Sequence, residues 1–359
     1  MTRRGADLMR RIWRSPSPGA TGIRWLLLPA AALYRAGTAL RNAAYDRGLL
    51  RARPLPVPSI GVGNLSVGGT GKTPLTAWIA GELARRGLAV GIVLRGYGDD
   101  ETLEHQAANP GAIVEADADR HAAAARAVAR GAQVLVLDDC LQRRDVVTDV
   151  MLALVSAESW TPVRWPLPAG PWREGLAALG RADAVVVTRK AAGRDEAGAL
   201  CRRLAPRAKG GIGIVAALEP AALRPASGGQ ELPLEVLRHR DVLVVAGIGE
   251  PDLVAAQLQR LEARIKLVAL DDHHVYDELE AARLAAAVPQ GGMAVTTAKD
   301  AVKLASLWPG GDPVLFVAAL RVAVDAGAET LEVLLGRVAT AARSPRNPGA
   351  AAAPSARDP

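Results

Sequence analysis

The chain has 359 residues, half of them apolar and 3% aromatic, which is enough to bury the core of one large or two moderate α/β domains. Residues 1–53 carry eleven arginines against two aspartates, a net charge of +9, so the rest of the +7 chain carries −2. This uneven distribution argues against a nucleic-acid partner and favours an anionic membrane surface. Two cysteines far apart in the sequence exclude a disulfide framework and indicate a reducing cytosol.

Residues 1–53 are predicted to form a basic, amphipathic, membrane-associating leader. An apolar run from Trp25 to Leu33 is followed by arginines spaced among Ala, Leu and Tyr34. The run is too short to span a bilayer, which needs about 20 apolar residues, so the pattern favours a helix lying in the headgroup layer. A secretory signal and an ordinary helix packed on the core are the alternatives.

Short β-branched runs alternate with Ala-rich helical stretches after the Pro-rich segment "RARPLPVP". This alternation predicts a nucleotide-binding α/β domain over residues 54–210, with a P-loop kinase-type, mostly parallel sheet and helices on both faces. Its strands are expected at 59–62, 90–94, 112–115, 134–137, 151–155 and 184–188.

The remaining chain is predicted to form a second, smaller α/β domain over residues 226–325. We expect an extended linker at 211–225 before it and a C-terminal helix at 326–340 after it. The tail at 341–359 is rich in Pro and Ala without periodicity, which predicts disorder. The strands of the second domain are expected at 242–246, 266–270, 294–297 and 314–318.

The stretch "SVGGTGKTP", residues 66–74, predicts a phosphate-binding loop between the first strand and a helix. In this context backbone N–H groups and the helix N-terminus converge on phosphate oxygens. Lys72 is expected to reach the β- and γ-phosphates and Thr73 to bind Mg²⁺. A plain glycine turn would explain the glycines but not the Lys-Thr pair. The expected nucleotide contacts are Gly68, Gly69, Thr70, Gly71, Lys72 and Thr73.

Acidic residues follow two of the predicted strands. In "VLVLDDCLQRRD", Asp138 and Asp139 end a buried-looking strand, the usual place for a group that holds nucleotide-bound Mg²⁺, although a helix cap or turn has the same pattern. In "LRGYGDDE", Arg95, Asp100 and Glu101 follow the second predicted strand, at 90–94, and a solvated turn is the alternative there.

Two adjacent histidines occur in "DDHHVY", residues 271–276, after a predicted strand of the second domain. Neighbouring side chains of an extended chain point to opposite faces, so the pair is a poor metal site. One histidine with a catalytic or phosphate-binding role is as well supported as a structural one.

In their order and spacing these motifs resemble the tetraacyldisaccharide 4'-kinases, also called lipid A 4'-kinases. The phosphate loop of that family also has Asn and Ser/Thr ahead of its glycines, so Ser66 fits it. The resemblance extends over residues 23–304, and the leader resembles the family's membrane-associating helix. The family's "DDGFQHR" is "DDCLQRR" here, with Arg143 in place of His, and the segment after "RGYG" is shortened. Further matching stretches are "LPAGPWRE" (167–174), "VAGIGEP" (245–251) and "TTAKDAVKL" (296–304).

The resemblance implies transfer of the ATP γ-phosphate to the 4'-hydroxyl of an acylated glucosamine disaccharide 1-phosphate, giving lipid IV A. It implies Mg²⁺ as a cofactor, the cytoplasmic face of the bacterial inner membrane as the location, and no obligate protein partner. The family's catalytic Asp and His correspond to Asp100 and His273, with Asp99 as the alternative to Asp100. Arg95, Glu101 and Arg173 are further candidates for substrate or phosphate contacts.

Two other functions share part of this pattern. A P-loop GTPase or metallochaperone-type switch would have the same loop, but its base-reading N-K-x-D motif is only echoed by "VVVTRKAAGRD". A catalytically inactive, membrane-bound nucleotide sensor would explain the altered "DDCLQRR". Turnover with a lipid disaccharide acceptor distinguishes the kinase from both.

Overall fold

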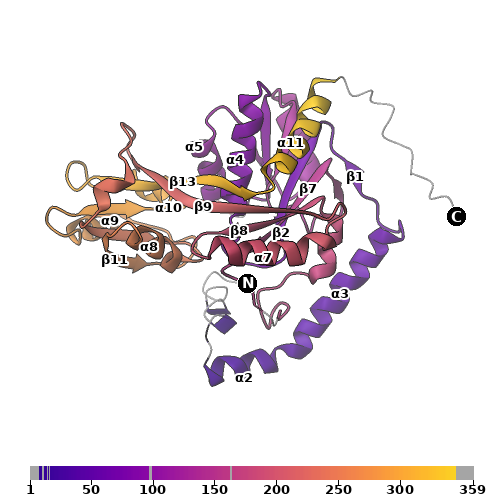
Figure 1. The fold of residues 1–359 in the computed structure, drawn as a ribbon, viewed down its shortest axis with the longest axis horizontal. Coiled ribbons are helices and arrows are strands. Elements are labelled where there is room, and N and C mark those ends of the chain that lie inside the picture. The colour runs from indigo at the N-terminus through magenta and orange to yellow at the C-terminus, as the bar shows by residue number, and fades with distance from the viewer. Residues whose placement is uncertain are drawn as a thin grey trace.

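One sheet of eleven strands runs through the molecule, in the order β11-β10-β12-β13-β9-β8-β7-β2-β5-β3-β4 (Figure 1). The computed structural model describes residues 8–9, 12–13, 15, 17–96, 99–161 and 164–344. The first residues of the expected leader and residues 345–359 of the expected tail lie outside these ranges. Every neighbouring pair of strands in the sheet is parallel except β9–β13, which confirms a mostly parallel α/β fold.

The strands begin and end within two residues of their predicted bounds, apart from β13, which is longer. The strands on the N-terminal side are β2 (Ser59–Asn64), β3 (Val90–Leu94), β4 (Ile113–Ala116), β5 (Val134–Leu137), β7 (Val150–Ser156) and β8 (Ala184–Arg189). On the C-terminal side they are β10 (Asp241–Ala246), β11 (Arg264–Ala269), β12 (Met293–Thr296) and β13 (Leu315–Ala326). β1 (Arg53–Pro54) and β6 (Val146–Val147) form a separate parallel pair.

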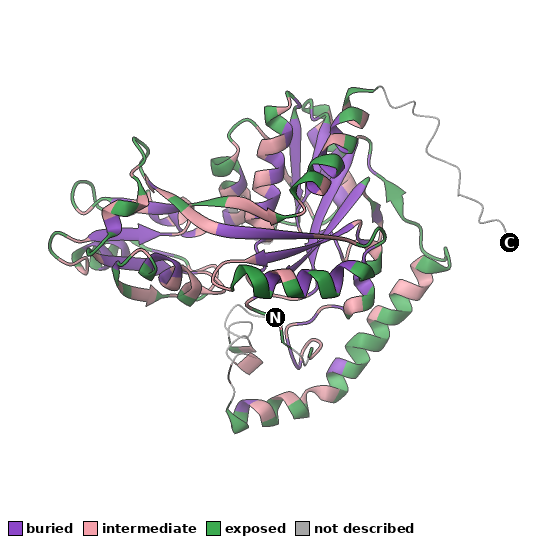
Figure 2. Ribbon diagram, in the orientation of Figure 1, coloured by how far each residue is buried: buried purple, intermediate pink, exposed green. Residues whose placement is uncertain are grey.

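Helices cover both faces of the sheet around the phosphate loop. Leu75, Ile79 and Leu83 of α4 (Lys72–Arg85) pack on one face together with α11 (Ala328–Arg343). α6 (Arg120–Ala129) and α7 (Arg194–Leu204) pack on the other. Figure 2 shows the strands between them as buried, as expected of parallel strands that are apolar on both faces.

Residues 212–225, where we expected a linker, form the long strand β9 (Ile212–Pro225), which pairs antiparallel with β13. The first half of β9 also pairs with β8, and the start of β13 pairs with β12. Between these zones, at residues 218–223 and 318–322, the sheet is two strands wide. β9 and β13 therefore form a bridge, visible in Figure 1, to a second part of the molecule.

The second part has its own helices on both faces of the sheet. α8 (Pro251–Gln259) packs on one face, and α9 (Glu278–Ala286) and α10 (Ala298–Leu304) pack on the other. Helix α5 (Asp99–Ala108) belongs to the first part and contacts α10 of the second. Three short 3₁₀ helices lie at Leu176–Arg181, Ala205–Arg207 and Leu234–Leu237.

The leader folds into α2 (Pro18–Leu26) and α3 (Leu28–Asp46), which lie alongside the α/β body (Figure 1). Its large apolar side chains face solvent: Leu26, Leu33 and Leu40 are 81%, 75% and 73% exposed. Within the described residues, no helix is both long and apolar enough to cross a membrane. Binding of the leader to a membrane interface stays a prediction.

Candidate active site

The loop between β2 and α4 has the backbone shape of an anion cradle. Gly68 and Gly71 have φ values of +130° and +79°, which favour glycine, and a Cβ on Gly71 would lie 2.2 Å from the Leu218 side chain. The buried Asn64 amide donates to the Ser66 carbonyl at 2.7 Å and to the Thr70 hydroxyl at 2.6 Å. Because α4 starts at Lys72, its first N–H groups have no partner within the helix and can bind phosphate.

The loop is also held by the second part of the molecule. Lys190, which follows β8, donates to the Gly69 carbonyl and to Glu250 of the β10–α8 loop, 2.7 Å away. The first part therefore meets the second directly at the phosphate loop. Lys190 and Glu250 were not predicted as site residues, and their contact between separate motifs leaves no signal in one sequence.

Lys72 lies beside Asp139, whose carboxylate it approaches to 3.3 Å. Arg173 contacts the same carboxylate at 2.8 Å from both oxygens. Burial alone would raise the pKa of Asp139, but the two cations hold that pKa well below its usual value. Asp139 also adopts φ +56°, unusual for a residue other than glycine, which turns its side chain away from that of Asp138 and toward the two cations. The structure thus brings Arg173 to Lys72 through Asp139.

Thr73 and Asp138 form the part of the site that suits a metal ion. The Thr73 hydroxyl donates to Asp138 Oδ2 at 3.3 Å, and Asp138 is 5% exposed. The other oxygen, Asp138 Oδ1, is buried without a hydrogen-bond partner among the described residues. Hydroxyl and carboxylate oxygens are ligands that Mg²⁺ accepts, so this orphaned oxygen and Thr73 fit a nucleotide-bound Mg²⁺.

His105 is a further residue of the site that the sequence did not reveal. It is completely buried on α5, and its Nε2 lies 3.2 Å from Asp138 Oδ2. Burial would lower the pKa of His105, but the hydrogen bond with Asp138 and the surrounding acids raise it above its usual value. His105 therefore contacts the same Asp138 oxygen as Thr73 and helps to hold that carboxylate in place.

Asp100 and His273 meet between the two parts of the molecule. His273 Nδ1 lies 2.6 Å from Asp100 Oδ2, and Lys303 Nζ lies 3.7 Å from the same oxygen. On the other side of the ring, Lys299 Nζ lies 3.2 Å from His273 Nε2. Burial would raise the pKa of Asp100, but His273 and the two lysines hold it well below its usual value.

The tautomer of His273 follows from these contacts. A lysine ammonium has only donors, so Nε2 accepts from Lys299 and the ring proton sits on Nδ1. His273 therefore donates to Asp100 and leaves its carboxylate ionised. Lys299 is itself held by Asp272 at 2.5 Å, which fixes the whole chain of contacts.

Helix α5 joins the two clusters, because Asp100 lies in its first turn and His105 one turn later. Between them, burial and the charge of Asp138 raise the pKa of Glu101, and burial raises the pKa of Glu104 to about 7. Both pKa shifts come mainly from burial, and the charge of nearby Asp138 adds to them. The predicted residues of the phosphate loop, the Asp138 site and the Asp100–His273 pair thus border one region.

Arg95, a further candidate, follows β3 and is exposed. The side chain of Asp99 lies outside the described residues, and Asp100 is the residue found against His273.

Comparison with known proteins identifies a family for this fold and site. The family model for LpxK, tetraacyldisaccharide-1-P 4'-kinase, matches residues 23–339. The chain belongs to this family. A tetraacyldisaccharide 4'-kinase of Anaeromyxobacter sp. (strain K) is 36% identical over 374 residues, covering 94% of this chain and 97% of that protein. Another from Syntrophus aciditrophicus is 33% identical over 340 residues, covering 83% and 89%.

A solved structure of an LpxK family member has the same overall fold. LpxK from Aquifex aeolicus, crystallised in complex with ATP, is 27% identical and superposes with a TM-score of 0.69, covering 88% of this chain and 99% of that one. The LpxK family assignment agrees with the resemblance that the motifs indicated.

Proposed function

We propose that this protein is an ATP-dependent kinase that phosphorylates the 4'-hydroxyl of an acylated glucosamine disaccharide 1-phosphate to form lipid IV A. The observation that carries the proposal is the hydrogen bond of Asp100 and His273, which places a base beside a phosphate loop in a chain of the LpxK family. ATP is the phosphate donor, as the solved relative binds ATP.

The phosphate loop binds and orients the donor. The N–H groups at the start of α4 hold the phosphates, and Lys72 neutralises charge on the transferred group. Thr73 and Asp138 would hold Mg²⁺, which would offset the negative charge of the phosphates. Asp139 keeps Lys72 and Arg173 together before ATP arrives, so that both cations are preplaced for the phosphates.

Asp100 positions the acceptor hydroxyl and takes its proton. In a loose phosphoryl-transfer transition state the hydroxyl loses its proton late, so a weakly basic carboxylate suffices if it is placed well. The lowered pKa of Asp100 keeps it ionised and able to accept a hydrogen bond from the sugar. His273 holds that carboxylate in place, and Lys299 fixes the ring of His273 in turn.

The leader brings the enzyme to its lipid acceptor. The exposed leucines of α2 and α3 insert into the interface, and the arginines contact anionic headgroups at the cytoplasmic face of the inner membrane. The protein is then peripheral or monotopic. This arrangement explains why the apolar residues of these helices face solvent.

Kinase turnover with ATP, Mg²⁺ and a detergent-dispersed disaccharide acceptor tests the function. We expect acceptor phosphorylation that Lys72→Ala lowers by orders of magnitude with no loss of folding, because Lys72 is a ligand contact and not part of the core. GTP hydrolysis without acceptor turnover would favour a switch protein. Nucleotide binding without any turnover would favour an inactive sensor.

A further inference from the structure

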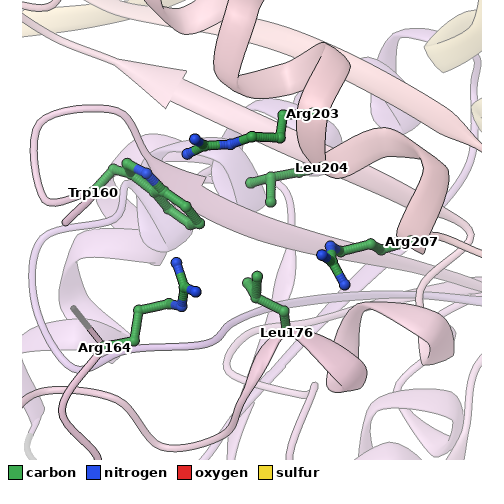
Figure 3. A pocket seen from close by; sticks show the side chains of 6 residues that line it. All are labelled: Trp160, Arg164, Leu176, Arg203, Leu204 and Arg207. Atoms are coloured by element: carbon green, nitrogen blue, oxygen red, sulfur yellow. The ribbon is translucent and has the colours of Figure 1, made fainter. Parts of the chain in front are cut away.

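A pocket with three arginines lies outside the phosphate-loop site, between α7 and the segment that precedes β8. Its cavity measures about 160 Å³. Figure 3 shows three guanidinium groups around this space, together with an indole ring and two leucines. The residues of this arginine pocket are Trp160, Arg164, Leu176, Arg203, Leu204 and Arg207.

The charge of the arginine pocket is not neutralised by the protein. None of its arginines forms an ion pair with a carboxylate of the described residues. Arg164 and Arg203 instead stack on the same ring, 5.2 Å and 4.9 Å from the centroid of Trp160. Glu196 of α7 lines the adjoining cavity with Arg203 but is not paired with it.

Two guanidinium groups on one indole repel each other, and the cation–π attraction offsets this repulsion only in part. An anion bound between them would remove it. Guanidinium groups bind phosphate oxygens through two parallel N–H bonds, so a phosphate group is the anion that suits this pocket. The cavity is well below the roughly 300 Å³ of a site for a drug-sized ligand, which suits a headgroup and not a nucleotide.

The residue that follows Arg164 of the arginine pocket contacts the leader. Trp165 follows Arg164 directly and meets Trp25 of α2 edge to face, with ring centroids 5.6 Å apart. Trp25 is 61% exposed and Leu26 is 81% exposed. The leader thus touches the body one residue away from the arginine pocket, an arrangement that suits a surface meeting both the acyl region and the headgroups of a bilayer.

We propose that the arginine pocket binds the phosphate headgroup of an anionic membrane phospholipid while the leader lies in the interface. The inference rests on the membrane location given under the proposed function. Bound headgroups would add a specific contact to the general attraction between a basic leader and an anionic leaflet. They would also fix the orientation of the body on the membrane, which a leader alone does not.

Vesicle binding of the full chain tests the pocket. Co-sedimentation is measured with phosphatidylcholine vesicles with and without phosphatidylglycerol, for the unaltered chain and for Arg203→Gln/Arg207→Gln. We expect the double substitution to weaken binding to the anionic vesicles roughly 30-fold, on the basis of about 1 kcal/mol for each arginine near the surface. The matched control is Arg240→Gln/Arg283→Gln, which removes two exposed arginines from the second part of the molecule.

The control should bind as tightly as the unaltered chain, and an equal loss in the control would overturn the proposal. Arg203→Lys/Arg207→Lys keeps the charge but not the planar fork, so full binding by this variant would reduce the pocket to a general electrostatic effect. Full competition by millimolar inorganic phosphate would point to a free-phosphate site instead. Turnover of the detergent-dispersed acceptor should be the same in all three variants as in the unaltered chain. A lack of turnover in the unaltered chain would contradict the proposed function and not the arginine pocket.

Discussion

His273 Nδ1 and Asp100 Oδ2 lie 2.6 Å apart although 173 residues separate them in the sequence. If Asp100 is the base and His273 orients it, Asp100→Ala and His273→Ala should each lower kcat on the order of 10²-fold or more with little change in the KM for ATP. Because the two side chains act as a unit, the double variant should be scarcely slower than either single one. Steady-state kinetics of the three variants measure this.

Neighbouring residues supply the controls for the pair. His274 is bound to Glu280 at 2.8 Å instead of Asp100, so His274→Ala should leave kcat near its normal value. A larger loss from Asp99→Ala than from Asp100→Ala would assign the base to the preceding aspartate. Losses that multiply in the double variant would show that Asp100 and His273 act independently.

His105 should affect magnesium through Asp138. His105→Leu removes the ring that contacts Asp138 Oδ2, and loss of such an outer contact typically weakens metal binding on the order of 10- to 100-fold. Calorimetric titration of ATP at several Mg²⁺ concentrations should show a higher Mg²⁺ requirement. His121→Leu is the control, because the His121 ring lies against the Asp145 carbonyl and not against Asp138. An unchanged Mg²⁺ dependence in His105→Leu would show that His105 only fills space in the core.

The leader's exposed leucines should drive membrane association. Substituting Leu26, Leu33 and Leu40 by Gln should weaken vesicle partitioning on the order of tenfold for each leucine that inserts, and should raise the KM for the lipid. The Tm should be unchanged, since these side chains are already in water. Leu279→Gln and Val333→Gln, exposed elsewhere, serve as controls. A lower Tm in the leader variant would indicate a helix packed on the core or on a second copy.

Glu104 predicts a pH dependence of stability. Its pKa is raised to about 7 in the folded chain, above the ordinary value of 4.5. A carboxyl group with a raised pKa contributes most to stability below pH 4.5, and this contribution is lost as the pH rises through 7. Glu104→Gln should therefore raise the Tm at pH 8 by about 1–3 °C and have little effect at pH 4. Calorimetric melting curves at both pH values test this, and equal shifts at the two would contradict it.

The parallel strands and the phosphate loop were predictable because their signals are local. Each strand is a short apolar run, and "GGTGKT" specifies its own turn and helix start. Residues 211–225 were predicted as an extended linker, and Pro220 and Pro225 are residues that a central strand does not favour. The partner of β9, strand β13, is about a hundred residues away, and a pairing over that distance leaves no mark in either segment.

In the candidate site, too, residues in local motifs were predictable and residues placed by long-range contacts were not. Asp100 and His273 came from their motifs, whereas no helix was predicted where α5 lies, and a solvated turn was the alternative for its first residues. Its residues "DDETLEHQAA" have no apolar stripe, so the periodicity that marks a helix is missing. His105 is buried on this helix, where its ring contacts the carboxylate of Asp138. This tertiary contact stabilises a helix that the local sequence does not favour. Lys299 and Lys303 were likewise visible only as part of a motif until their contacts with His273 and Asp100 were known.

The two-stranded bridge of β9 and β13 resists a change in length more strongly than a change in twist. An intact ladder resists stretching, whereas the twist between neighbouring strands varies widely. The ladder of the bridge has a register shift at Ala319/Leu320, and a change of strand twist there would move His273 relative to Asp100. The distance between His273 and Asp100 thus depends on the length of two strands. An insertion or deletion in either strand would slow phosphoryl transfer without changing any residue of the site.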